Sequence, residues 1–178
     1  MTKDNEEKSF NFFLEAAKKG EPYASNEVGI CYHLGKAVKQ NYSEAFKWYE
    51  KAAAKGSIAA LRNLGILYKE GKGVAKNYIK AFEYFEKASL KGFVPAYFDL
   101  GYAYFYGRGT KQNKYTAVSW FKKGVEAGNA DCEYGLGYCY YYGEGIIQNT
   151  NKGIDLLKQA SKKGIKNAKE LINKIENQ

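Results

Sequence analysis

Few side chains in this 178-residue chain could do covalent or metal chemistry. The chain has one histidine, His33, and three cysteines, Cys31, Cys132 and Cys139. A zinc site needs several His, Cys or acidic ligands close together, and a catalytic triad would have His33 as its only possible base. We therefore expect no catalytic residue, no metal site and no cofactor, and we interpret His33 as a surface or packing residue.

Glycine shows how the chain is organised, because it recurs every 36 residues, at positions 20, 56, 92, 128 and 164. The same interval is kept by Gly29, Gly65, Gly101 and Gly137; by Gly35, Gly71, Gly107 and Gly143; by Tyr32, Tyr68, Tyr104 and Tyr140; and by Asn41, Asn77, Asn113 and Asn149. A fixed period of roughly 20 to 50 residues is typical of solenoids, which usually serve as surfaces for partners.

Within each repeat the spacing of apolar residues becomes helical. From Tyr42 to Lys55 these residues form the broad stripe of a helix that packs on both sides. Asn41 is expected to cap this helix, and Glu44 three residues later is expected to complete a capping box. Gly56 is expected to end the helix in the left-handed conformation.

A partner helix is predicted from about Ile58 to Glu70, with Gly65 in its middle. A glycine there costs roughly 1 kcal/mol relative to alanine, so its recurrence in every repeat predicts close approach by a neighbouring helix. The sequence therefore predicts an all-α solenoid of about four 36-residue helix-turn-helix repeats. We place a leading helix at 9–20, repeats at 21–56, 57–92, 93–128 and 129–164, and a closing cap at 165–178.

The residues from Ala60 to Val74 read Ala-Leu-Arg-Asn-Leu-Gly-Ile-Leu-Tyr-Lys-Glu-Gly-Lys-Gly-Val, and Asn77, Lys80, Ala81 and the run Tyr84 to Ala88 follow them. This pattern resembles the Sel-1-like repeat, a relative of the tetratricopeptide repeat, from Phe10 to about Ala168. The resemblance implies a right-handed superhelix that acts as a non-catalytic adaptor or scaffold for protein–protein interaction.

Two departures from the family pattern bear on the loops. Asparagine replaces the usual aspartate at all four loop ends, which should leave the fold unchanged because both residues cap helices well. Ala37 replaces the second loop glycine of the first repeat, and this leaves the conformation of that loop open.

A cysteine-rich, secreted bacterial branch of the family has been linked to β-lactam binding or hydrolysis. That branch joins each helix pair through cysteines eight residues apart, and of the ten equivalent positions here only Cys132, opposite Gly124, is a cysteine. A β-lactamase-like enzyme is therefore the least favoured alternative. Three sparse cysteines instead suggest a reducing compartment and buried packing.

Candidate binding residues are those that vary while the scaffold repeats. The resemblance to tetratricopeptide arrays implies that three positions on the first helix of each repeat line the concave face. These positions are Asn26, Ile30 and His33; Arg62, Ile66 and Lys69; Phe98, Tyr102 and Phe105; and Tyr134, Tyr138 and Tyr141. They are largely polar or basic in the first two repeats and aromatic in the last two. Exposed aromatic clusters commonly mark interfaces, and packing against adjacent helices is the alternative.

The net charge of +9, with 28 basic residues and 17 tyrosines, raises nucleic acid as a rival partner. Many lysines, however, are predicted at helix ends, where they complement the helix dipole. We therefore favour a protein or peptide partner with acidic and apolar anchors, and the oligomeric state stays open.

The N-terminal residues from Met1 to Ser9 are charged, unlike a secretory signal. No apolar run approaches the roughly 18 to 20 residues that a membrane span requires. We expect a cytoplasmic protein with no membrane span.

Overall fold

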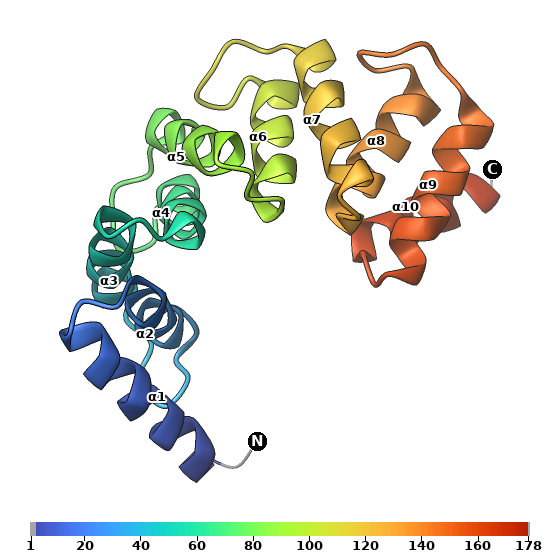
Figure 1. Ribbon diagram of the computed structural model, residues 1–178. Helices are drawn as coiled ribbons and strands as arrows, with labels where there is room; N and C mark the ends of the chain where they lie inside the picture. Colours follow the sequence, from blue (N-terminus) through green and yellow to red (C-terminus); the bar gives the residue numbers. More distant parts are fainter. Residues whose placement is uncertain (1–2, 178) are drawn as a thin grey trace. The chain divides into compact units, whose positions relative to one another are not determined.

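The computed structural model describes residues 3–177, and every regular element within them is an α-helix (Figure 1), as the sequence predicts. The helices belong to two compact units, residues 1–91 and 92–178. The first unit contains α1 (Lys3–Lys18), α2 (Pro22–Leu34), α3 (Tyr42–Ala54), α4 (Ile58–Glu70) and α5 (Tyr78–Leu90). The second contains α6 (Pro95–Tyr106), α7 (Lys114–Glu126), α8 (Ala130–Tyr142), α9 (Thr150–Lys162) and α10 (Lys166–Glu176).

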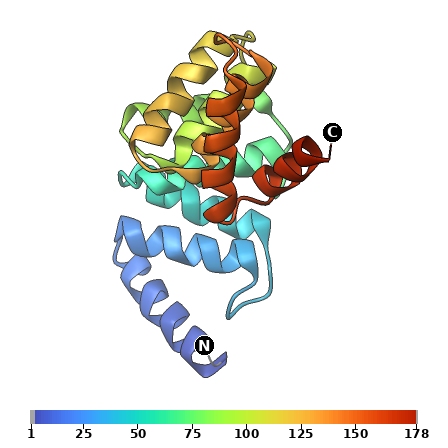
Figure 2. The same cartoon turned by 90° about the vertical axis from the view of Figure 1, so that its right-hand side faces the viewer.

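Helices that follow one another in sequence pack together within each unit. In the first unit α1 packs on α2, α2 on α3, α3 on α4 and α4 on α5. In the second, α6 packs on α7, α7 on α8, α8 on α9 and α9 on α10, and the turn from α9 into α10 can be followed in Figure 2. Each unit is thus a stack of helix pairs with apolar side chains between them.

The leading helix differs from the prediction at its N-terminal end. It begins at Lys3 instead of position 9, and its first turn holds Asp4 and Glu6, whose negative charges favour a helix N-terminus. Lys8 Nζ lies 2.8 Å from Asp4 Oδ2 one turn earlier, an arrangement that stabilises an exposed helix slightly. Charged residues without apolar periodicity therefore extend the helix.

Asparagine caps the second helix of each pair, as predicted. The side-chain oxygen of Asn41 accepts a hydrogen bond from the backbone N–H of Glu44 at 3.1 Å. The same capping is provided by Asn77, Asn113 and Asn149. The reciprocal half of the predicted capping box is not formed, because the backbone N–H of Asn41 donates to the carbonyl oxygen of Tyr32 at 2.9 Å. The Glu44 carboxylate accepts a hydrogen bond from Lys47 Nζ at 2.7 Å instead.

The recurrent mid-helix glycine allows an aromatic ring of the paired helix to pack against the backbone. A Cβ atom built on Gly65 of α4 would lie 2.6 Å from the ring of Phe85 on α5. The same construction on Gly101 of α6 gives 2.5 Å to Phe121 on α7. Since real Cβ atoms do not approach so closely, only glycine fits these positions. The predicted close approach is confirmed.

In the last repeat Leu157 stands at the position of Phe85 and Phe121. The two helices still pack closely there, because a second glycine lies on the facing helix. Gly153 occupies the position that holds alanine in the earlier repeats. A Cβ built on Gly153 would lie 2.7 Å from the backbone nitrogen of Tyr141, and one built on Gly137 would lie 3.1 Å from the carbonyl oxygen of Gly153. The backbones of α8 and α9 therefore approach each other directly.

Ala37 adopts the backbone conformation that glycine adopts in the other loops. Its φ is 60°, against 72° for Gly73 and 69° for Gly145. This left-handed region costs an L-residue about 1 to 2 kcal/mol. Ala37 packs against the buried cluster that contains Phe10 and Val28, which offsets part of that cost.

Candidate functional site

The predicted site residues lie on the first helix of each pair, which is α2 or α4 in the first unit and α6 or α8 in the second. Within the first unit, Asn63 of α4 donates a hydrogen bond to Asn26 Oδ1 of α2 at 2.9 Å. Within the second, the rings of Phe105 and Tyr138 meet edge to face at 5.9 Å. Each unit therefore brings its own six predicted residues onto neighbouring helices.

Asn26 is buried, which corrects the prediction that it is exposed. Its side chain retains only 4% of its exposure, and besides accepting from Asn63 it donates to Glu27 Oε1 at 3.2 Å. A buried amide needs such partners, since leaving it unpaired would cost about 1 to 3 kcal/mol. Asn26 thus links two helices and is not part of an open surface.

His33 is half-buried and packs against two tyrosines. Its Nδ1 lies 3.4 Å from the Tyr49 hydroxyl, and its ring meets Tyr42 edge to face at 5.4 Å. Burial lowers the pKa of His33 below its usual value, and the charge of Lys72 lowers it further. These contacts agree with a packing residue.

The other predicted residues of the first unit are partly exposed and mixed in chemistry. They are Ile30, Arg62, Ile66 and Lys69. The Lys69 ammonium lies 5.7 Å from the centre of the Phe85 ring, close enough for a cation–π contact. Lys72 and Glu70 form an ion pair at 2.8 Å beside it. This surface therefore combines two isoleucines with two basic residues.

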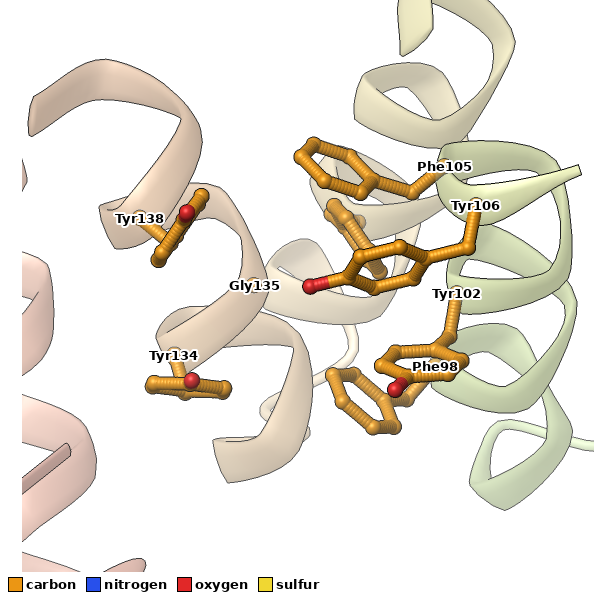
Figure 3. A pocket seen from close by; sticks show the side chains of 8 residues that line it. Phe98, Tyr102, Phe105, Tyr106, Tyr134, Gly135 and Tyr138 are labelled. Carbon is orange, nitrogen blue, oxygen red and sulfur yellow. The ribbon is translucent and has the colours of Figure 1, made fainter. Parts of the chain in front are cut away.

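The aromatic residues of the second unit form a shallow groove between α6 and α8, which we call the tyrosine groove (Figure 3). It is lined by Phe98, Tyr102, Phe105, Tyr106, Phe121, Tyr134, Gly135 and Tyr138. Its cavity volume is about 40 Å³, whereas small-molecule sites usually measure about 300 to 1,000 Å³. The groove is therefore much smaller than an ordinary small-molecule site.

Two tyrosine pairs, 36 residues apart, stand on α6 and α8. The rings of Tyr102 and Tyr106 are 4.6 Å apart and inclined at 50°, and those of Tyr138 and Tyr142 are 4.6 Å apart and inclined at 46°. Members of each pair are four residues apart and so share one helix face. The repeat thus gives neighbouring helices the same ring arrangement.

Phe105 is buried, with 7% exposure, so the prediction of an exposed ring is wrong at this position. Its ring packs between Tyr106 at 4.9 Å and Tyr138 at 5.9 Å. For Phe105 the alternative interpretation holds, in which the ring packs against an adjacent helix. Tyr141 is partly exposed but contacts Tyr142 and does not line the groove.

Sequence reasoning missed three residues of the groove, Tyr106, Phe121 and Gly135, and of these Tyr106 is 49% exposed. Its counterpart Tyr142 is 48% exposed. A signal was present, because the equivalent positions in the first two repeats hold Leu34 and Glu70, so this position varies as well. The predicted position lies one residue earlier, and one residue turns a helix by about 100°.

The groove offers hydroxyl groups and a cation beside its rings. Burial raises the pKa of Tyr106, Tyr134 and Tyr138 above the usual value. The Arg108 guanidinium lies 5.0 Å from the centre of the Tyr102 ring and 5.5 Å from that of Tyr106. Hydrogen-bond donors and positive charge therefore accompany the apolar floor.

Among residues 3–177 no group of three or more His, Cys, Asp and Glu side chains is placed to hold a metal ion. In the same part of the chain no helix combines the length and the apolar character needed to cross a bilayer.

We expect Cys132 and Cys139 to be unreactive in the native protein. Both are fully buried, and burial raises the pKa of each thiol to about 12, which leaves on the order of one thiolate in ten thousand at pH 8. Cys31 is only partly buried and should react first with iodoacetamide, as followed by mass spectrometry. All three should react in urea, and native labelling of Cys132 as fast as Cys31 would contradict the burial.

Paired helices at a 36-residue interval, with a repeated scaffold and a varying first-helix surface, define an α-solenoid repeat protein. The sequence pattern of the Sel1 repeat matches residues 1–21, 22–57, 58–93, 94–129 and 130–165. The chain therefore belongs to the Sel1 repeat family, whose repeats generally mediate protein–protein interaction. The first match assigns the leading helix α1 to an incomplete copy of the repeat.

Solved structures support this assignment. A Sel1 repeat protein from Oxalobacter formigenes is 31% identical over 93% of this chain, with a TM-score of 0.87, and a protective antigen present in uropathogenic Escherichia coli strains is 31% identical over 93%, with a TM-score of 0.79. The chain spans 66% and 36% of their lengths. Cysteine rich protein B of Helicobacter pylori is 27% identical over 74% of this chain and 95% of its own, with a TM-score of 0.57. No curated protein matches the chain.

Proposed function

We propose that this chain is a non-catalytic scaffold that binds a protein or peptide along the faces of its first helices. The tyrosine groove carries this proposal, since it combines partly exposed tyrosines, an apolar floor and a volume too small for a metabolite. Tyrosine is enriched among the residues that dominate binding energy at protein interfaces. The polar surface of α2 and α4 would add a second contact region.

The partner is expected to present apolar and acidic groups. Apolar side chains suit the groove, and acidic ones suit Arg108 beside it and Arg62 and Lys69 on α4. The net charge of +9 would speed association with an acidic partner. We place this interaction in the cytoplasm, a reducing compartment in which three unpaired cysteines persist.

Nucleic acid fits the side chains less well. Lys51 and Lys123 lie over the rings of Trp48 and Trp120, at 4.2 and 4.6 Å from the ring centres. Rings covered in this way are not open to stack on bases, which is the contact that single-strand binders use. Lys51 and Lys123 therefore have local ring contacts, and the two tryptophans are not open platforms for bases.

We expect the variant Tyr102→Ala, Tyr106→Ala, Tyr138→Ala to lose its partner. Each truncation of a central interface tyrosine typically costs about 1 kcal/mol or more, so capture should fall at least about tenfold. The measurement is affinity capture from a lysate of the source organism, with quantitative mass spectrometry. Circular dichroism would verify that the variant remains helical.

Tyr115→Ala is the matched control, because Tyr115 is 77% exposed on α7 and does not line the groove. Its captured proteins should equal those of the unaltered chain. A folded triple variant that keeps every partner would contradict binding at the groove. Loss of capture after nuclease treatment would favour nucleic acid instead.

A further inference from the structure

We propose that two copies of this chain associate through α1, with the two α1 helices packed antiparallel about a two-fold axis near Phe12. The tyrosine groove belongs to the second unit and α1 to the first, so this surface is separate from the groove. A two-fold axis brings the same surface of each copy together, and the surface must therefore be complementary to itself.

The first observation is that α1 exposes a face that is covered in the equivalent helix α3. Phe12 is 72% exposed, whereas Trp48, which stands 36 residues later, is half-buried. Phe13 is half-buried, whereas its equivalent Tyr49 is fully buried. The helix that covers this face of α3 is α2, because the Tyr49 ring lies against Gly29. The corresponding face of α1 is therefore open to a further helix.

The side of α1 that packs on α2 is a different one. Phe10 and Ala17 are buried there together with Ala24 and Val28 of α2. In Figure 1, α1 lies at the end of the first unit, beside α2. Phe12 is two residues from Phe10, which turns it about 200° around the helix and away from this contact.

The open face is apolar at its centre. The Phe12 and Phe13 rings are 5.8 Å apart, and Phe13 meets Tyr23 at the start of α2 at 6.0 Å. Tyr23 is itself exposed. Ser9 and Ala16, about one turn before and one turn after Phe12, are small side chains that allow another helix to approach. Clustered exposed rings of this kind commonly mark interfaces.

The charges along α1 argue for a second α1 that runs in the opposite direction. Residues 3–11 contain three acidic and two basic residues, and residues 12–19 contain one acidic and two basic residues, so the net charges of the two halves are −1 and +1. Antiparallel packing places each half against the half of opposite charge, whereas parallel packing would place like charges together. The helix dipoles also favour the antiparallel arrangement.

Four charged side chains define how the two helices align. Asp4, Lys8, Glu15 and Lys19 lie along one side of α1, because their spacing of four, seven and four residues follows the helical turn. In an antiparallel pair centred near the middle of α1, Lys8 of one copy comes opposite Glu15 of the second copy, and Asp4 comes opposite Lys19. Exposed charge pairs of this kind orient an interface more than they strengthen it.

The last helix, α10, is poorly suited to cover α1 of another copy. It stands at the position of a first helix, but Asn173 occupies the place of the recurrent glycine. Where Gly29 accepts the ring of Tyr49, the side chain of Asn173 would obstruct Phe13. Lys169, one turn before Asn173, is exposed as well. Association of α1 with α1 is therefore favoured over head-to-tail association, and it stops at two copies.

Sedimentation equilibrium of the full chain over a wide concentration range tests the proposal. A contact centred on two 16-residue helices is small, so we expect a monomer–dimer equilibrium with a dissociation constant of roughly 10⁻⁵ M. Phe12→Lys should raise this constant at least about tenfold. Leu90→Lys is the matched control, because Leu90 is 73% exposed on α5 of the same unit, and it should leave the constant unchanged.

Reversing charges tests the antiparallel alignment. Lys8→Glu places two carboxylates opposite each other at both ends of the contact, so dimerisation should weaken severalfold. Adding Glu15→Lys restores opposite charges and should return the dissociation constant to within about twofold of the original value. Circular dichroism would verify that every variant remains helical.

Three results would overturn the inference. The first is a chain that stays monomeric near 10⁻³ M, about a hundredfold above the expected dissociation constant. The second is a dimer that Phe12→Lys leaves intact, or one that Glu15→Lys does not restore after Lys8→Glu. The third is a series of species larger than the dimer, which head-to-tail association would produce.

Discussion

Gly124→Ala is expected to lower the free energy of unfolding by about 2 to 3 kcal/mol, as overpacking a buried contact usually does. A Cβ built on Gly124 of α7 would lie 2.1 Å from Sγ and 2.6 Å from Cβ of Cys132 on α8. Cys132 is fully buried and cannot move aside freely. The helix propensity gained on replacing glycine by alanine, about 1 kcal/mol, is the smaller effect.

A second substitution should rescue this variant. The equivalent pairs in the other repeats are two alanines, as in Ala52 with Ala60 and Ala88 with Ala96, so the chain has exchanged Ala–Ala for Gly–Cys at this contact. Adding Cys132→Ala removes the sulfur and restores the common pair. Most of the lost stability should return, with a coupling energy of about 1.5 kcal/mol or more between the two sites.

Urea denaturation would measure these free energies. Trp120 lies in the same unit as Gly124, so a Trp48→Phe background would confine the fluorescence signal to that unit. Cys132→Ala alone, which removes only one atom from the core, should cost about 1 kcal/mol. Additive effects of Gly124→Ala and Cys132→Ala would contradict the direct clash.

Gly73→Ala is expected to be equally costly, about 3 kcal/mol, although Gly73 lies in an exposed loop. Its φ of 72° is unfavourable for alanine. A Cβ would also lie 2.5 Å from the carbonyl carbon and oxygen of Tyr42 and 2.8 Å from the nitrogen of Ser43. These are backbone atoms at the start of α3, which cannot rotate away as a side chain does.

Ala37→Gly is the matched control at the same position of the first repeat. Alanine already occupies the left-handed conformation there, so glycine relieves strain but gives up a small apolar contact and adds freedom to the unfolded chain. We expect a change within about 1 kcal/mol of zero. Chemical denaturation followed by circular dichroism would compare the two variants. If Gly73→Ala lowered the free energy of unfolding no more than Ala37→Gly does, the backbone at the start of α3 would have shifted to accommodate the added Cβ.

Much of the fold could be predicted because it depends on local and periodic features. Asn41 and its three equivalents cap helices through bonds that span three residues, and Gly56 ends its helix with its own backbone conformation. A glycine in the middle of a helix destabilises that helix, so its recurrence in every repeat predicted a compensating close contact between helices. The ring that fills each site, such as Phe85 against Gly65, also kept the 36-residue interval.

The candidate site could be predicted only in part. Phe98, Tyr102, Tyr134 and Tyr138 line the groove as the repeat register suggested, but Phe105 is a buried part of its lining, and the exposed ring is that of Tyr106, one residue later. Asn26 is buried and accepts a hydrogen bond from Asn63. In both cases a residue of the neighbouring repeat covers the side chain: Tyr138 packs on Phe105, and Asn63 bonds to Asn26.

The sequence by itself thus determined that the chain is a series of helix pairs, which asparagines and glycines mark the ends of the repeated helices, and which repeats carry rings in place of polar groups. These properties follow from bonds and propensities within a few residues and from a period that packing preserves. Only the tertiary structure decided which side of α6 and α8 is open. A step of one residue turns a helix by about 100°, so exposure depends on how the next helix packs. That packing leaves Tyr106 in the groove and Phe105 beneath it.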